Sequence, residues 1–275
     1  MPEDLKAFLH SAAMDGLVDW QSYETARQLF GISYPEIERV VLEQGLFPKR
    51  YAAQQQLFQL EGQLKLFRAR VAVVGCGGLG SCLVEMLART GIGTLRLIDP
   101  DVFAESNLNR QLLCTIDSLG RPKVEVAAER IACLNPAVTV TTVAEALDGK
   151  NARRLLAEVD VVVDALDSIP VRRELAHVCR QMNLPLVHGA VTGWYGQVAV
   201  QSPGDDLVSR LYSHPGQPEM ELSPDNFSAG VAAVASLQAV LAVKVLLDVE
   251  PLPANAWFSF DLKEVDLERI DFGSG

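Results

Sequence analysis

A glycine-rich turn directly after a valine-rich segment constrains the fold of this chain more than any other feature. The segment from Arg70 to Gly75 reads Arg-Val-Ala-Val-Val-Gly, which is typical of a short strand buried on both faces of a parallel sheet. G-x-G-x-x-G spacing follows, with one extra glycine: Gly75, Gly77, Gly78 and Gly80. Gly75 suits a sharp turn from strand to helix. Gly77 and Gly78 let a ligand approach the backbone, whereas Gly80 lets the helix pack tightly on the strand.

The residues after this turn favour a nucleotide as the ligand. A helical run from Ser81 to Thr90 follows, and the free N–H groups at a helix start attract an anion, most often a phosphate. A second strand, Thr94–Ile98, ends before Asp99, which follows Gly80 by 19 residues. An acidic side chain at this distance accepts hydrogen bonds from ribose hydroxyls. We therefore expect nucleotide binding. The alternative is that the glycines serve only a tight turn and close packing.

Further polar residues separate this chain from a dehydrogenase. Asp101, Asn107, Arg110, Gln111 and Lys123 all follow the second strand, at the edge where open parallel sheets bind ligands. A guanidinium and an ammonium group that converge there suit the charge of a triphosphate. A hydride-transfer site needs no such cluster. The sequence thus predicts a triphosphate ligand whose charge Arg110 and Lys123 neutralise, with Asn107 and Gln111 positioning it.

The order of predicted elements indicates an α/β fold. Strands and helices alternate between residues 68 and 190, as in a Rossmann-like, mostly parallel sheet with helices on both faces. Closing strands are expected at Trp257–Asp261 and Val265–Ile270, antiparallel at the edge of the sheet. The most apolar run, Phe227–Val249, is interrupted by polar residues and rich in small ones, which favours a buried central helix over a membrane span.

A carboxylate on the same sheet edge is a candidate metal ligand. The strand Asp160–Asp164 leads into Ala-Leu-Asp, so that Leu166 and Asp167 lie just beyond its carboxyl end. Mg²⁺ prefers one or two carboxylates plus phosphate oxygens, which makes Asp167 a suitable ligand. Leu166, which directly precedes it, is expected to bind the nucleotide. The alternative is that the Asp-Ser-Ile-Pro stretch only caps a helix. The four histidines show no metal-binding spacing and are expected to be solvated or satisfied in the core.

The first part of the chain is predicted to be a helical amino-terminal arm. Residues 1–67 carry helical periodicity without a strand signal, and small helices of this kind usually pack against the body or a second subunit. We therefore divide the chain into this arm and a nucleotide-binding domain, residues 68–275. Within that domain Pro, Gly, Ser and acidic residues concentrate at about 202–227, which is expected to form a long, mobile loop.

The composition predicts the cellular compartment of the protein and argues against some classes of partner. The formal net charge of −11 argues against broad binding to nucleic acid or anionic lipid. The five cysteines form no C-x-x-C pair, so neither a disulfide framework nor a zinc site is indicated. The first residues lack the basic start and the apolar block of a secretory signal. We expect a cytoplasmic protein without a membrane segment, a nucleic-acid partner or zinc.

Together these motifs resemble the ThiF/MoeB/HesA family, the bacterial relatives of ubiquitin-activating enzymes. The matching segments are Gly75–Gly80, Asp99–Asp101, Ser106–Gln111, Gly120–Lys123 and Asp164–Asp167. The resemblance spans about residues 50 to 250 and implies an ATP- and Mg²⁺-dependent adenylyltransferase. Its substrate would be the C-terminal Gly-Gly carboxylate of a ubiquitin-like sulfur carrier protein, in a pathway such as thiamine or molybdopterin synthesis. The resemblance also implies a homodimer, catalytic roles for Arg110 and Lys123, and a magnesium ligand at Asp167.

Departures from the family pattern keep two other functions open. A Lys-Arg-Tyr segment in the arm starts like the family's Arg-Tyr-x-Arg motif, but Ala53 stands where a second arginine usually reaches the partner's ATP site. Either Lys49 or Arg50 substitutes, or that contact is missing. Ser168 replaces a usual asparagine, and no cysteine follows Cys179, so no thioester or persulfide step is expected on this chain. The alternatives are a tRNA threonylcarbamoyladenosine dehydratase-like enzyme and a catalytically degenerate protein that binds nucleotide or carrier.

Overall fold

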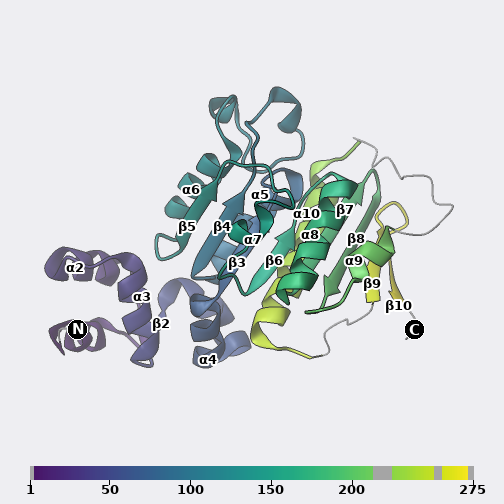
Figure 1. Cartoon of the computed structure of the whole chain (residues 1–275). Coiled ribbons are helices and arrows are strands. Elements are labelled where there is room, and N and C mark those ends of the chain that lie inside the picture. The colour runs from purple at the N-terminus through teal and green to yellow at the C-terminus, as the bar shows by residue number, and fades with distance from the viewer. Residues whose placement is uncertain (1–2, 213–224, 251–255, 272–275) are drawn as a thin grey trace.

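An eight-stranded β-sheet forms the centre of the protein (Figure 1). The computed structural model describes residues 3–212, 225–250 and 256–271. The strand order across the sheet is β10-β9-β8-β7-β6-β3-β4-β5. The parallel strands are β3 (Arg70–Val74), β4 (Thr94–Ile98), β5 (Thr139–Val143), β6 (Val161–Asp164) and β7 (Leu186–Thr192). The antiparallel strands are β8 (Tyr195–Gln201), β9 (Ala256–Asp261) and β10 (Asp266–Asp271). This order confirms the predicted Rossmann-like sheet with antiparallel carboxyl-terminal strands.

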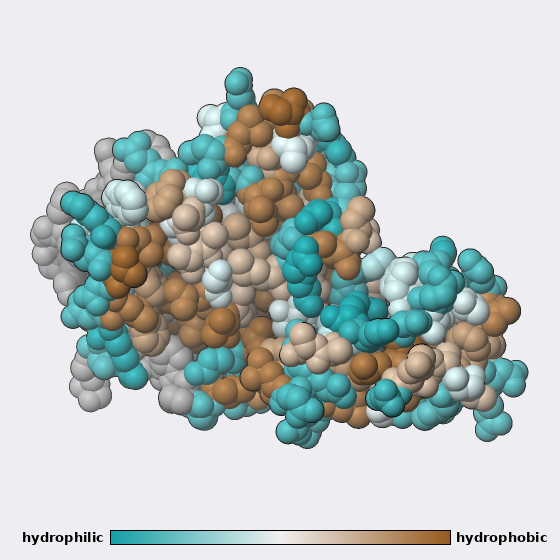
Figure 2. Space-filling model, turned by 180° about the vertical axis from the view of Figure 1, so that it is seen from behind, coloured by the Kyte–Doolittle hydropathy of each residue, from teal (hydrophilic) through white to brown (hydrophobic). Residues whose placement is uncertain are grey.

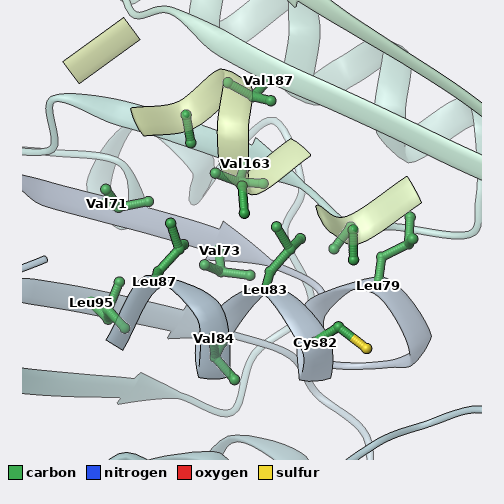
Figure 3. Packing of buried hydrophobic residues seen from close by; sticks show 14 of the residues in the cluster. Val71, Val73, Leu79, Cys82, Leu83, Val84, Leu87, Leu95, Val163 and Val187 are labelled. Carbon is green, nitrogen blue, oxygen red and sulfur yellow. The ribbon is translucent and has the colours of Figure 1, made fainter. Parts of the chain in front are cut away.

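Helices cover both faces of the sheet, as predicted. One face carries α5 (Gly78–Thr90), α6 (Lys123–Leu134) and α10 (Ser228–Leu247), and the other carries α7 (Ala152–Leu155), α8 (Ile169–Met182) and α9 (Leu207–Leu211). The residues of β3 alternate between the two cores. Val71 and Val73 pack in the core that contains α5, whereas Ala72 and Val74 pack with α7 and α8. Figure 3 shows Val73 beside Leu83 of α5.

The glycine turn between β3 and α5 depends on two close backbone approaches. Gly75 adopts a φ of +97°, and a Cβ atom there would lie 2.5 Å from the carbonyl oxygen of Ala165. A Cβ atom on Gly80 would lie 1.9 Å from the carbonyl oxygen of Gly75. The helix can therefore pack directly on the turn, and it begins at Gly78 rather than at Ser81 as predicted.

The most apolar helix of the chain, α10, is a core helix in this structure. By length and composition alone it could cross a membrane. It packs against α5 and against strands β7 and β8, however, and half of its most apolar window is buried. This packing agrees with the predicted buried central helix.

The amino-terminal arm has a hydrophobic cluster of its own. Its buried residues are Leu46 and residues of α1 (Glu3–Ala12), α2 (Trp20–Phe30), α3 (Tyr34–Glu43) and the short strand β1 (Leu17–Val18). The short helix η1 (Lys49–Gln54) and α4 (Gln55–Arg68) connect the arm to the sheet, so the proposed domain division falls between α4 and β3 (Figure 1). The prediction of an arm without strands was wrong, because β1 and β2 (Phe47–Pro48) pair in parallel. Strands of two residues are too short to show alternation in a sequence.

The expected loop at about 202–227 is partly helical. The helix α9 lies inside it, with Leu207 and Val208 fully buried. A five-residue helix among Pro, Gly and acidic residues has no clear periodicity, so the sequence did not reveal it. Residues 213–224, to which most of that expectation applies, lie outside the described part of the chain.

Candidate nucleotide-binding site

A cavity of about 500 Å³ lies at the carboxyl ends of β3, β4 and β6. Its walls come from the glycine turn, the start of α5 and α6, and the segments that follow β4 and β6. The predicted nucleotide residues that line it are Gly75, Gly77, Gly78, Asp99, Asp101, Arg110, Gln111, Lys123, Leu166 and Asp167. Two predicted residues, Gly80 and Asn107, do not line it. The structure thus brings together side chains that are far apart in the sequence, at the predicted edge of the sheet.

Asp99 ties the glycine turn to the segment after β4. Its Oδ2 accepts a hydrogen bond from the N–H of Cys76 at 2.6 Å, and its Oδ1 accepts one from the N–H of Asp101 at 2.8 Å. Burial raises the pKa of Asp99, although the two backbone donors and Lys123 oppose the rise. Each carboxylate oxygen keeps a second lone pair, so Asp99 can still accept a hydrogen bond from a ligand hydroxyl.

Two of the cationic side chains that line the cavity, Arg110 and Lys123, differ in burial and in hydrogen-bond partners. Lys123 is buried at the start of α6, and its Nζ lies 2.8 Å from Oδ2 of Asp101. Arg110 is half-buried and follows the short helix η2 (Glu105–Asn107). Its Nη1 donates to the carbonyl oxygen of Ser106 at 2.8 Å and to Oδ1 of Asn109 at 2.9 Å. Because neither acceptor is charged, Arg110 keeps its full charge for an anionic ligand, whereas Lys123 shares its charge with Asp101.

We expected both Asn107 and Gln111 to position the ligand, but only Gln111 lines the cavity. Gln111 is buried, lines the cavity, and has no hydrogen-bond partner for its Oε1 within the described residues. Asn107 instead caps its own turn, because its Oδ1 accepts from the N–H of Ala104 at 3.0 Å. Its carbonyl oxygen accepts from the N–H of Gln111 at 2.9 Å. Asn107 therefore supports the segment that carries Gln111 and contributes no lining to the cavity.

Asp167 is the carboxylate best placed for a metal ion. It follows the end of β6, is exposed, and lines the cavity. It forms no hydrogen bond or ion pair with another described residue. No group of three or more His, Cys, Asp or Glu side chains that could hold a metal exists in the described part of the chain. A lone carboxylate of this kind suits Mg²⁺, which takes most of its ligands from phosphates and water.

A buried polar network that the sequence did not reveal lies behind Leu166. Asp164, the last residue of β6, is fully buried, and its Oδ2 lies 2.6 Å from Nδ1 of His188 on β7. The Oη of Tyr212 lies 3.1 Å from Nε2 of His188 and accepts a hydrogen bond from Arg172 of α8 at 3.0 Å. His188 is thus satisfied in the core, as expected. Asp164 and His188 are neighbours only because β6 pairs with β7, so no local sequence signal could have joined them.

Arg50, one of the two side chains considered for the missing arm contact, is already engaged within the arm. Its guanidinium forms an ion pair with the buried carboxylate of Glu38 and lies 4.7 Å from the ring centroid of Tyr23. Lys49 is exposed. Of the two candidates, therefore, Lys49 is the one that forms no salt bridge with another described residue.

The chain that carries this glycine turn and these cavity-lining cations also matches the pattern of a known protein family. The ThiF family pattern matches residues 51–274. The chain belongs to the ThiF family. This result confirms the resemblance that the motifs indicated, and the matched range includes the whole sheet and every residue that lines the cavity.

Relatives within the ThiF family carry the names of carrier-protein enzymes. The SAMP-activating enzyme E1 of Haloferax volcanii is 39% identical over 218 residues, which cover 77% of this chain and 80% of that protein. The sulfur carrier protein ThiS adenylyltransferase of Escherichia coli is 35% identical over 207 residues, which cover 74% of this chain and 82% of that protein. These names confirm the predicted enzyme class, an adenylyltransferase of the ThiF/MoeB type.

A solved structure resembles the fold over more of the chain than the family pattern matches. The crystal structure of E. coli MccB with ATP superimposes with a TM-score of 0.71 at 23% sequence identity, covering 92% of this chain and 83% of that one. At this identity the likeness shows the fold alone.

Proposed function

We propose that this protein is an ATP- and Mg²⁺-dependent adenylyltransferase that activates the C-terminal Gly-Gly carboxylate of a ubiquitin-like sulfur carrier protein. The observation that carries the proposal is the cavity in which the glycine turn, Arg110, Lys123 and Asp167 meet. The relatives support the class of partner, because one is named for the sulfur carrier ThiS and another for activating a SAMP.

The proposed reaction requires alignment and charge neutralisation. A carboxylate oxygen of the carrier attacks the α-phosphorus of ATP, the bond from that phosphorus to the bridging oxygen breaks, and pyrophosphate leaves with the bonding electrons. The carrier then holds an acyl-adenylate. A carboxylate is already ionised at neutral pH, so no general base is needed. Catalysis then depends on holding the reactants in line and on stabilising negative charge.

The cavity residues divide these tasks. The guanidinium of Arg110 and the ammonium of Lys123 would neutralise phosphate charge. Asp99 would accept hydrogen bonds from the ribose through the lone pairs that its backbone donors leave free, and Gln111 would bind a polar group of the nucleotide through its unpaired Oε1. Asp167 would hold Mg²⁺, which supplies charge neutralisation between the phosphates when it is bound.

The sulfur step is assigned to another protein. No cysteine follows Cys179, so the expected loop at about 202–227 offers no thiol for a covalent intermediate. The carrier adenylate formed here would therefore be released to a separate sulfur donor.

We also propose a homodimer through a second surface. A groove of about 730 Å³ runs between α4 and α10 and includes the exposed apolar side chains of Leu57 and Val240. Figure 2 shows hydrophobic residues gathered on the face opposite to that of Figure 1. Burial of such a face against a second copy would remove apolar area from water. Sedimentation equilibrium tests this: the dimer is expected in the native protein, and Val240→Glu should yield monomers.

Carrier-dependent ATP–pyrophosphate exchange tests the proposed activity. Purified protein, Mg²⁺ and a panel of carriers ending in Gly-Gly are expected to give exchange with at least one carrier. Arg110→Ala and Asp167→Ala should each abolish it. Arg121→Ala changes a half-buried residue and Asp117→Ala an exposed one, both outside the cavity; these controls should retain exchange. Retained exchange in Arg110→Ala or Asp167→Ala would remove those role assignments.

Failure of exchange with every carrier would change the proposed function itself. Measurable ATP binding without exchange would favour the degenerate binding protein. Binding of tRNA at moderate salt would favour the dehydratase-like enzyme, although the net charge of −11 opposes it.

A further inference from the structure

Both backbone polar groups of Leu166 are held by buried charged side chains. Its N–H donates to Oδ1 of Asp164 at 3.0 Å, and its carbonyl oxygen accepts a hydrogen bond from the guanidinium of Arg172. Asp164 is 0% exposed and Arg172 only 2%. Because Leu166 directly precedes Asp167, these contacts fix the backbone from which Asp167 lines the cavity.

Two further contacts immobilise the same turn. The side chain of Gln238 on α10 donates to the carbonyl oxygen of Asp164 at 2.8 Å, and the N–H of Ala165 donates to the carbonyl oxygen of Val74 at 2.9 Å. The turn is therefore anchored from β3, α8 and α10. The side chain of Asp167, in contrast, is exposed and makes no hydrogen bond to another described residue. A rigid backbone thus presents a carboxylate that is left for a ligand.

Tyr212 holds the terminal nitrogen of Arg172 that does not bond Leu166. Its Oη accepts hydrogen bonds from Nη1 of Arg172 and from Nε2 of Gln197, each at 3.0 Å. The same hydroxyl lies 3.1 Å from Nε2 of His188, whose Nδ1 lies 2.6 Å from Asp164. The chain of contacts therefore closes on itself, because Asp164 and Arg172 meet again at Leu166.

Burial sets the protonation states that satisfy this closed network. Burial lowers the pKa of His188 and raises the pKa of Tyr212, so the imidazole is neutral and the phenol keeps its proton. Burial alone would raise the pKa of Asp164, but Arg172 and His188 outweigh it and the pKa is lowered. A neutral His188 with its proton on Nδ1 donates to Asp164 and accepts the hydroxyl proton of Tyr212. The network thus holds one buried anion and one buried cation.

Stability alone is a weak reason for this arrangement. A buried ion pair can often be replaced by apolar side chains without loss of stability, because removing two charges from water is costly. The pair here borders the cavity, because Arg172 is one of its lining residues, and the charge of Arg172 interacts with Asp167 as well as with Asp164. Asp164 therefore balances Arg172 and leaves the charge of Asp167 available to a metal ion.

We propose that Arg172 and Tyr212 are positioning residues that hold the Leu166 peptide so that Asp167 meets the magnesium ion of bound ATP. Neither residue needs to touch the nucleotide phosphates for this role. The inference rests on the proposed function of the site, and it adds that magnesium affinity is set by a network outside the metal's own ligands.

Isothermal titration calorimetry of ATP, with and without Mg²⁺, tests the inference in Tyr212→Phe. This variant removes one hydroxyl and leaves the ring. We expect the magnesium-dependent gain in ATP affinity to fall by about tenfold, the effect of losing one hydrogen bond to a charged group. Without Mg²⁺ the affinity should stay within about twofold of the native protein. Arg172→Lys, which keeps the charge but not the planar fork, should show the same selective loss.

Tyr23→Phe is the control, because it also removes the hydroxyl of a hydrogen-bonded tyrosine, but one that donates to Glu38 in the arm, away from the cavity. It should leave both affinities unchanged. An unchanged magnesium-dependent gain in Tyr212→Phe would overturn the inference, and so would equal losses with and without Mg²⁺, which indicate a general structural role. If Tyr212→Phe does not fold, Arg172→Lys decides by the same measurement. A native protein whose ATP affinity ignores Mg²⁺ would reject the proposed function, and this inference with it.

Discussion

The Nζ atom of Lys123 lies 2.8 Å from Oδ2 of Asp101, in a pair whose lysine side chain is 8% exposed and whose aspartate side chain is 63% exposed. The pair keeps a cation inside the cavity before any nucleotide is present, because a buried ammonium without a partner would be unstable. It also means that Lys123 must share its charge between Asp101 and an incoming phosphate.

Lys123→Met should therefore weaken ATP binding strongly. The variant removes a charged donor, which is worth about 1.5–3 kcal/mol, or about 10–150-fold in affinity. Titration calorimetry with ATP measures the change, and Lys150→Met, at an exposed lysine outside the cavity, is the control. Equal affinities for ATP in the native protein and Lys123→Met would show that Lys123 serves only Asp101.

Gly80→Ala should both destabilise the fold and abolish nucleotide binding. Its new Cβ would lie 1.9 Å from the carbonyl oxygen of Gly75, so α5 would have to move away from the turn. Overpacking of this kind costs about 1–3 kcal/mol and sometimes more. Urea unfolding measures the loss. A variant with a native unfolding midpoint would show that the turn is less tightly packed than this geometry requires.

Features that depend on residues close together in the sequence could be predicted. Contacts that depend on which strands pair across the sheet could not. The glycine turn has a local signal and lies where it was predicted. The pair formed by Asp164 and His188 depends on the order of β6 and β7, which no local pattern encodes. Asn107 was expected at the ligand because its residue type suits that role, but its side chain caps its own turn instead.

His188 should make folding stability sensitive to mild acid. Burial lowers its folded pKa below the ordinary value of 6.5, so the unfolded chain binds a proton first as the pH falls. Stability then decreases with falling pH, by about 1 kcal/mol between pH 6.5 and 5.5 from this group alone. Chemical unfolding at several pH values measures it. His188→Gln should lose this part of the pH dependence, and His10→Gln, at an exposed position, should keep it. Parallel curves for native protein and His188→Gln would contradict the assignment.

The cysteines should differ sharply in reactivity. Cys133 is exposed, whereas burial raises the pKa of the other thiols: Cys76, Cys82, Cys114 and Cys179. Because the thiolate is the reactive form, a thiol reagent should modify Cys133 alone in the native protein and all five cysteines after denaturation. Cys133→Ser should be unreactive until it unfolds. Rapid modification of a second cysteine would show that one of the buried sites opens easily.

We expect the neighbouring residues Arg50 and Lys49 of the arm to have different roles, because Arg50 stabilises the fold and Lys49 does not. Arg50→Ala leaves the carboxylate of Glu38 buried without its cation, and the remaining partner is the hydroxyl of Tyr23 at 2.5 Å. Because the side chain of Arg50 is 22% exposed, we expect a loss near the lower end of the range for buried pairs, about 3 kcal/mol.

Lys49→Ala is the matched variant, since Lys49 is exposed, and its unfolding free energy should stay within about 0.5 kcal/mol of native. Urea unfolding compares the two variants directly. If Lys49 supplies the arm's contact to phosphate, Lys49→Ala should also raise the KM for ATP in the exchange reaction without changing stability. The opposite result, a stable Arg50→Ala with a raised KM, would mean that Arg50 leaves Glu38 to reach the nucleotide.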